Sequence, residues 1–104
     1  KGLGCEIAEA MAEAGAHVVC ADVDEAGNER TAARVRALGR EALALRCDVT
    51  READVVALFR EADAHFGGVD IAFANAGIAD PLPQPLHDYP SEDWHRVMAV
   101  NLTG

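Results

Sequence analysis

Two glycines separated by one residue, Gly2 and Gly4, stand directly before a helical pattern near the start of the chain. A helix N-terminus presents N–H groups without intrahelical partners and carries a partial positive charge, and glycine lets an anion approach that backbone closely. The pair could therefore hold a phosphate group. By itself a Gly-x-Gly is common, and the third glycine of the usual dinucleotide fingerprint is absent, since Ile7 stands three residues after Gly4.

Polar residues that could bind the rest of a dinucleotide end three apolar runs further along. Asp22 ends HVVCAD, Asp48 ends ALALRCD, and Asn75-Ala76-Gly77 ends VDIAFANAG. An aspartate after a strand is more often a turn or helix cap than a ribose ligand, and Asn-Ala-Gly could be only a turn. Order and spacing favour binding, because Asp22 stands eighteen residues after Gly4, close to the ~20 expected of a carboxylate that receives ribose hydroxyls.

Helical segments precede and separate the three apolar runs, which are predicted to be strands. Each helical segment has apolar residues at steps of three and four and ends at a glycine, and Thr50 is expected to be the N-cap of the third. The expected apolar faces consist of Leu3, Ile7, Met11 and Ala14, then Val35 and Leu38, then Val55, Phe59, Ala62 and Phe66. Strands that alternate with helices predict βαβ units with right-handed crossovers, in a parallel sheet covered on both faces.

The texture of the sequence changes after Gly77. All four prolines fall within IADPLPQPLHDYP, which predicts an extended loop, and Ser91 is expected to cap a last helix led by Glu92 and Asp93. In an open parallel sheet, ligands bind beyond the carboxyl ends of the strands. The glycines, the aspartates and the Asn-Ala-Gly are therefore expected at one edge of the sheet.

The composition limits the functions that are open to the chain. With 104 residues, 50% of them hydrophobic, and a formal net charge of -9, the sequence predicts one small globular domain. Nucleic acid and membranes are disfavoured as partners, because nucleic acid and anionic membrane surfaces both attract positive charge and no apolar run approaches the ~20 residues of a membrane span. No signal-peptide pattern is present, so we expect a soluble, cytoplasmic protein.

The cysteines and histidines do not predict a metal site. The three cysteines lack Cys-x-x-Cys spacing and lie in apolar stretches, which favours buried, reduced thiols. His65, His87 and His95 have spacings that match no ligand motif. We therefore expect no metal ion.

Five short motifs in this order resemble the N-terminal half of a classical short-chain dehydrogenase/reductase: GLG at 2–4, ADV at 21–23, CDVT at 47–50, NAG at 75–77 and VNLTG at 100–104. The two-residue step between the glycines fits the Thr-Gly-x-x-x-Gly-x-Gly motif of the classical branch better than the Gly-x-x-Gly-x-x-Gly of the extended branch. The resemblance implies an α/β fold with a Rossmann-like doubly wound parallel sheet. Residues 1–104 would form a partial NAD(P)-binding domain, without the first strand and the C-terminal half, and a chain that does not begin with Met fits that expectation.

The resemblance also implies roles for individual residues. Leu3 and the glycines would face the pyrophosphate, Asp22 would take the adenosine ribose, and Asn101 matches an asparagine that helps to hold a water in the family's proton relay. The expected cofactor contacts are Gly2, Leu3, Gly4, Asp22, Val23, Cys47, Asp48, Val49, Asn75, Ala76, Gly77 and Val100. The family's catalytic Ser and Tyr-x-x-x-Lys pair lie further on, and four residues after Tyr89 stands Asp93, not Lys.

The implied activity is hydride transfer between a nicotinamide cofactor and an alcohol or ketone substrate, with this chain supplying the cofactor half of the site. Asp22 would repel a 2′-phosphate, which favours NAD over NADP, whereas Lys1 would favour NADP.

Two alternatives stay open: a module that binds a dinucleotide without redox chemistry, and a piece that is inactive alone. The complete protein is expected to be a homo-oligomer, a dimer or tetramer, and Trp94, Val97 and Met98 of the last helix would pack on the core or on a neighbouring subunit.

Overall fold

A computed structural model of the chain describes residues 2–79 and 90–104. Its elements are, in chain order, α1 (Leu3–Glu13), β1 (Val18–Asp22), α2 (Glu25–Ala37), β2 (Ala42–Arg46), α3 (Glu52–Phe66), α4 (Ser91–Met98) and the π-helix η2 (Ala99–Thr103). Lys1, His87 and Tyr89 lie outside the described residues, as does most of the loop that the prolines predict. None of the described helices has the length and apolar character that crossing a membrane requires.

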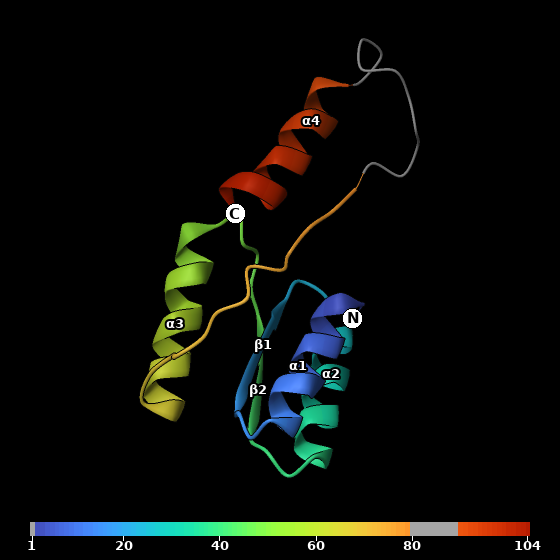
Figure 1. The fold of residues 1–104 in the computed structure, drawn as a ribbon. Helices are drawn as coiled ribbons and strands as arrows, with labels where there is room; N and C mark the ends of the chain where they lie inside the picture. The colour runs from blue at the N-terminus through green and yellow to red at the C-terminus, as the bar shows by residue number, and fades with distance from the viewer. Residues whose placement is uncertain (1, 80–89) are drawn as a thin grey trace.

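The two strands form a parallel pair in which Val18 lies opposite Ala42 and Asp22 lies opposite Arg46. Helices α1 and α2 lie on one side of the strands and α3 lies on the other (Figure 1). Both strands run toward the end at which α1 begins, so their carboxyl ends and the N-terminus of α1 share one edge (Figure 1). The predicted α/β class and partial Rossmann-like sheet are confirmed.

The buried core lies between the strands and the layer formed by α1 and α2. Ala32 and Val35 of α2 have 0% exposed surface, and Val35 is the largest fully buried side chain. The cluster consists of Ala8, Ala12, Cys20, Ala32, Val35 and Ala42. Because most of these side chains are small, the helices can lie close to the strands.

Several large apolar side chains that the sequence places on buried faces are exposed instead. In α1 the buried residues are Cys5, Ala8 and Ala12, whereas Leu3 is 64% exposed. Leu38 and Phe59 are also exposed, by 43% and 47%. A pair of short strands offers too little surface to cover the apolar faces of three helices, so the side chains directed away from the pair stay in contact with solvent.

The prediction of a third strand at VDIAFANAG is wrong, because residues 69–77 form no strand. The segment runs as an extended chain from the end of α3 toward the edge where β1 and β2 end (Figure 1). The N–H of Asn75 donates to the carbonyl of Phe73 at 2.9 Å, a local turn in place of a ladder bond. In the doubly wound strand order 3-2-1-4 of the family that the sequence resembles, β1 and β2 correspond to strands 2 and 3, and this segment corresponds to strand 4, whose neighbour is strand 1. An extended segment without a neighbouring strand cannot form a ladder.

Two helix caps differ from those predicted. Thr50 bonds to Asp48, and Arg51 precedes the first residue of α3. Ser91 is the first residue of α4, and its N-cap position is taken by Pro90. The predicted helix stops are confirmed at three glycines with positive φ, namely Gly15, Gly39 and Gly67.

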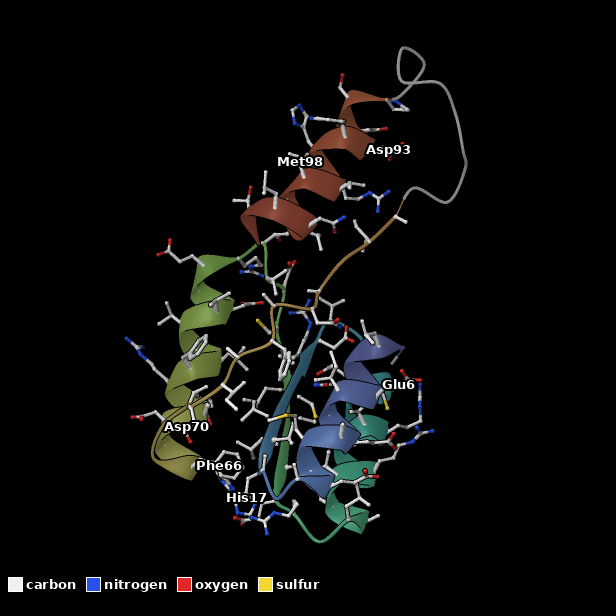
Figure 2. All side chains as sticks on the ribbon, viewed as in Figure 1. Glu6, His17, Phe66, Asp70, Asp93 and Met98 are labelled. Atoms are coloured by element: carbon white, nitrogen blue, oxygen red, sulfur yellow. The ribbon has the colours of Figure 1, made fainter. Side chains whose placement is uncertain are left out.

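An aromatic contact fixes α3 at the end of the sheet opposite the shared edge. The rings of His17 and Phe66 are stacked, with centroids 5.7 Å apart and planes inclined by 3° (Figure 2). Nδ1 of His17 accepts the N–H of Glu41 at 2.9 Å. The His17 ring therefore joins the end of α3 to the residues that precede both strands.

We predict that the isolated 104-residue chain self-associates and binds NAD weakly. Val69, Ile71 and Phe73 are 44%, 60% and 56% exposed at alternate positions of the unpaired segment, and such segments pair readily with other chains. Light scattering after size exclusion should show association that Ile71→Lys reduces. Ala37→Lys, which adds the same charge at an exposed position on α2, should leave association unchanged. A monomer at every concentration, with a cooperative thermal transition and micromolar NAD affinity, would contradict the prediction.

Candidate cofactor-binding site

The N-terminus of α1 presents backbone donors at the shared edge. Gly2 has a φ of 60°, and its carbonyl accepts the N–H of Glu6 at 3.4 Å, the first hydrogen bond of the helix. The amides of Leu3, Gly4 and Cys5 come before that bond and have no partner within the helix. No side chain of the described residues, 2–79 and 90–104, caps this end. Free amides together with the helix dipole suit an anion such as a phosphate.

Asn75 reaches this helix end from the extended segment. A Cβ on Gly4 would lie 2.8 Å from Nδ2 of Asn75, closer than real Cβ atoms approach a neighbour. The side-chain amide therefore lies directly against the backbone of Gly4, and any other residue at position 4 would displace it. The fold thus brings together two predicted cofactor contacts that are far apart in the sequence.

Asp22 ends β1 with a half-buried carboxylate at the same edge. Its Oδ1 accepts the N–H of Asp24 at 3.1 Å, and its Oδ2 has no hydrogen-bond partner among residues 2–79 and 90–104. One oxygen therefore shapes the turn into α2, and the other can accept a bond from a ligand. The turn and ribose-binding roles, which are alternatives at the sequence level, are compatible in the structure. Val23, the next predicted contact, is 55% exposed.

Asp48 begins a loop that is fixed from two sides. Its Oδ1 accepts the N–H of Thr50 at 2.9 Å and the hydroxyl of Thr50 at 2.6 Å. These bonds hold the pKa of the Asp48 carboxyl below its ordinary value, because they favour the charged form. The N–H of Asp48 donates to Oδ2 of Asp54 at 3.0 Å, and Asp54 also pairs with Arg46 at 3.5 Å.

Cys47 links this loop to the end of β1. Its N–H donates to the carbonyl of Asp22 at 3.1 Å, and the residue is 3% exposed. Burial raises the pKa of the Cys47 thiol, and the Asp54 and Asp48 carboxylates raise it further. A contact between Cys47 and a cofactor would therefore come from its backbone and not from its sulfur. All three cysteines are buried and free, which confirms the prediction of buried thiols.

Asn101 holds the extended segment directly after the Asn-Ala-Gly. Its Oδ1 accepts the N–H of Ile78 and its Nδ2 donates to the carbonyl of Ile78, both at 2.8 Å. The two bonds join residues that lie 23 positions apart in the chain. Oδ1 also lies 3.6 Å from the position of a Cβ on Gly77. Asn101 therefore fixes the segment that carries three predicted contacts.

The end of η2 approaches the Asp48 loop. A Cβ on Gly104 would lie 2.7 Å from Cγ2 of Val49, so the glycine allows this close packing. Val100 is half-buried in the same element. Through Val49 and Asn101, η2 touches two of the predicted binding segments. Trp94, which is 48% exposed, lies on α4.

Sequence reasoning missed Asp54 as a residue that shapes this edge. The acidic first turn of α3, with Glu52 and Asp54, was the available signal. Acidic residues are favoured in any first helical turn because of the helix dipole. The bond from Asp54 to the preceding loop could therefore not be told apart from this general preference.

Comparisons with known proteins match almost the whole chain. A family model described as Enoyl-(Acyl carrier protein) reductase matches residues 1–104. The chain is 46% identical over 103 residues to cis-4-hydroxycyclohexanecarboxylate dehydrogenase of Sinomonas cyclohexanicum, which covers 99% of this chain and 41% of that protein. It is 38% identical over 104 residues to galactitol 2-dehydrogenase of Agrobacterium fabrum, which covers 100% of this chain and 39% of that protein.

A solved structure gives the same result. The crystal structure of a short-chain type dehydrogenase/reductase from Mycobacterium marinum matches with a TM-score of 0.92 and 36% identity, over 98% of this chain and 39% of that chain. The chain belongs to the short-chain dehydrogenase/reductase family. It spans about two fifths of the length of the relatives it matches. The comparisons therefore cover one part of the short-chain dehydrogenase/reductase fold and not the whole of it.

We predict that Thr50→Val raises the pKa of Asp48 toward its ordinary value, because the substitution removes the 2.6 Å bond that favours the carboxylate. Because the folded-state pKa is lowered, the stability that this turn contributes is present at neutral pH and is lost as the pH falls through that pKa. The variant should lose it at a higher pH. Carbon NMR titration of the carboxyl group measures the shift.

Thr31→Val is the control for this titration, since the hydroxyl of Thr31 bonds to the carbonyl of Gly27 and not to a carboxylate. It should leave the pKa of Asp48 unchanged. The same titration curve for Thr50→Val and the parent chain would show that the turn does not set this pKa.

Proposed function

We propose that the complete protein is an oxidoreductase that transfers a hydride between NAD and an alcohol or ketone substrate. The chain described here supplies the half of the site that binds the cofactor. The observation that carries this proposal is the meeting of the α1 N-terminus, the Asp22 carboxylate and the Asn75 amide at one edge of the sheet. Membership of a family whose relatives are named as dehydrogenases supports it.

The residues present fit a dinucleotide. Unpaired amides at the start of α1 suit the pyrophosphate, and Gly2 has open space where a side chain would project. Asp22 has a carboxylate oxygen available for the ribose hydroxyls, and the Asp48–Val49 loop would flank the adenine. When bound, the cofactor supplies the hydride acceptor or donor. Asn75, Ala76 and Gly77 would line the channel toward its reactive ring.

In the proposed function, Asn101 holds the segment that lines the cofactor channel in place. Its two bonds to Ile78 use one acceptor site of Oδ1 and one N–H of Nδ2. An amide has two acceptor sites and two N–H groups. The remaining pair can bind a water of the proton relay while the Ile78 bonds stay intact.

The charge of Asp22 favours NAD over NADP. A 2′-phosphate would come close to the carboxylate, and two negative charges in contact repel strongly at low effective dielectric. Lys1, the residue that favours NADP, lies outside the described part of the chain. We give Asp22 more weight because it would touch the ribose directly.

The remaining parts of the proposal concern the complete protein. We place it in the cytoplasm as a homo-oligomer with a small-molecule substrate, on the basis of composition and family. The sequence that follows Gly104 in the complete protein tests the redox function. A Tyr-x-x-x-Lys pair there supports the enzyme, and its absence supports a module that binds the dinucleotide only.

We predict that Asp22→Ala narrows the preference for NAD. Loss of charge-assisted hydrogen bonds should lower kcat/KM with NAD by roughly tenfold to a hundredfold, while kcat/KM with NADP falls less or rises. Steady-state kinetics of the complete protein with both cofactors measure this. Asp70→Ala removes the same charge at the opposite end of the sheet (Figure 2) and should change neither value. A parent protein that prefers NADP would overturn the assignment.

We predict that Asn101→Ala lowers kcat by about tenfold or more, the order expected when one member of a proton relay is lost, with a smaller loss of NAD affinity because Asn75 still holds the segment against Gly4. Single-turnover kinetics and NAD titration of the complete protein separate the two effects. Thr103→Ala, at an exposed position of the same π-helix, is the control and should leave kcat unchanged. An unaltered kcat in Asn101→Ala would limit this residue to a structural role.

A further inference from the structure

Asn28 is a polar side chain buried between α2 and the two strands. It is 5% exposed. Its Nδ2 donates to the carbonyl of Cys20 in β1 at 2.8 Å and to the carbonyl of Leu45 in β2 at 3.1 Å. Both N–H groups of the amide are therefore used, one on each strand. Among the described residues, no other side chain bonds to both strands.

These two bonds lie directly behind the candidate site. Cys20 precedes Asp22 by two residues, and Leu45 precedes Asp48 by three. The Asn28 amide therefore joins the start of α2 to the carboxyl ends of both strands, just before the chain enters the two loops that would bind the adenosine.

The same helix also positions the Asp22 carboxylate. Asp22 Oδ1 accepts the N–H of Asp24, and Asp24 in turn caps α2 by accepting the N–H of Gly27 at 3.1 Å. A shift of α2 along the strands would move the Asp24 N–H and with it the carboxylate. The Asn28 bonds oppose such a shift, because they join the first turns of α2 to both strands.

Stability alone does not explain an asparagine at this position. Asparagine is a weaker helix former than leucine, and an apolar side chain would fill a buried site without needing partners. Both carbonyls belong to the parallel pair, so the neighbouring strand supplies them with hydrogen-bond donors and the Asn28 amide is not needed for that purpose. What the amide adds is directional, since its bonds form only when helix and strands have one relative position.

We propose that Asn28 is a positioning residue for cofactor selection. By fixing the start of α2 against the ends of β1 and β2, it keeps the Asp24 N–H on Oδ1 of Asp22, and so holds that carboxylate in the orientation that fits an adenosine without a 2′-phosphate. This inference rests on the proposed function. Without the two bonds, the start of α2 can shift, the Asp24 N–H that holds Oδ1 of Asp22 moves with it, and the discrimination against the 2′-phosphate falls.

The test compares Asn28→Leu with Thr31→Val in the complete protein. Thr31 lies one turn further along α2, is 6% exposed, and bonds only within the helix, to the carbonyl of Gly27 at 3.2 Å. Asn28→Leu should raise KM for NAD with little change in kcat. It should lower the ratio of kcat/KM for NAD to kcat/KM for NADP by roughly three- to tenfold, the size of one net hydrogen bond. Thr31→Val should leave the ratio unchanged.

Hydrogen exchange measured by mass spectrometry provides a readout that needs no turnover. Asn28→Leu should speed exchange in residues 20–24 and 45–50, and Thr31→Val should not. Faster exchange with an unchanged cofactor ratio would overturn the inference, because the amide would then be a structural tether only. Unchanged exchange in Asn28→Leu would overturn it as well.

The two readouts keep the inference separate from the proposed function. A parent protein that turns over neither cofactor refutes the proposed function, and the inference about cofactor selection falls with it, while the exchange data still report on the tether. Activity that prefers NAD, with an unchanged ratio in Asn28→Leu, refutes the inference alone. Should Asn28→Leu not fold, Asn28→Ser retains a single donor on a shorter side chain that cannot bond to both strands, and the same ratio decides.

Discussion

The parallel pairing of β1 and β2 is the constraint on which the rest of the structure depends. Two parallel strands require a crossover that returns the chain to its starting end, and α2 is that crossover. The arrangement places Asp22 and Asp48 at the same edge and seats α2 against both strands. It also turns the N-terminus of α1 toward that edge (Figure 1). The positions of Asp22 and Asp48 therefore follow from strand direction, since the carboxyl ends of parallel strands lie on the side where ligands bind in an open α/β sheet.

Side-chain amides replace sheet hydrogen bonds in the segment that lacks a ladder partner. Residues 69–79 are held at the site by Asn75, which lies against Gly4, and by Asn101, which bonds to both backbone groups of Ile78. A paired strand would distribute this restraint over its whole length. Here it falls on two asparagines near the carboxyl end of the segment, whereas Val69 and Ile71 stay exposed. The part of the segment that would meet the cofactor is thus more firmly placed than the part that would complete the sheet.

Local patterns predicted the elements that local interactions stabilise. The three main helices with their glycine stops and the strands β1 and β2 follow from apolar spacing, and the glycine motif and Asp22 follow from their position at element ends. The third strand was predicted wrongly because a strand forms only beside a neighbouring strand, and the apolar pattern of a segment carries no information about its neighbour. The roles of Asn28 and Asp54 were missed for a related reason, since each depends on a partner in another element. Asn101 was identified through resemblance, and its bond to Ile78 appears only in the folded chain.

Carboxylates at the site divide their oxygens between the fold and the ligand side. Asp22 uses Oδ1 on the Asp24 N–H, and Asp48 uses Oδ1 on Thr50, which leaves Oδ2 of each without a hydrogen-bond partner in the described part of the chain. Two carboxylates lie at one edge of a chain of net charge -9, and they oppose an anion placed directly beside them. In the proposed function, the phosphates of the dinucleotide would lie on the amides of the α1 N-terminus, and its uncharged ribose would face Asp22. In the proposed function, the same carboxylates would oppose a further phosphate on that ribose, which is the basis of the proposed preference for NAD.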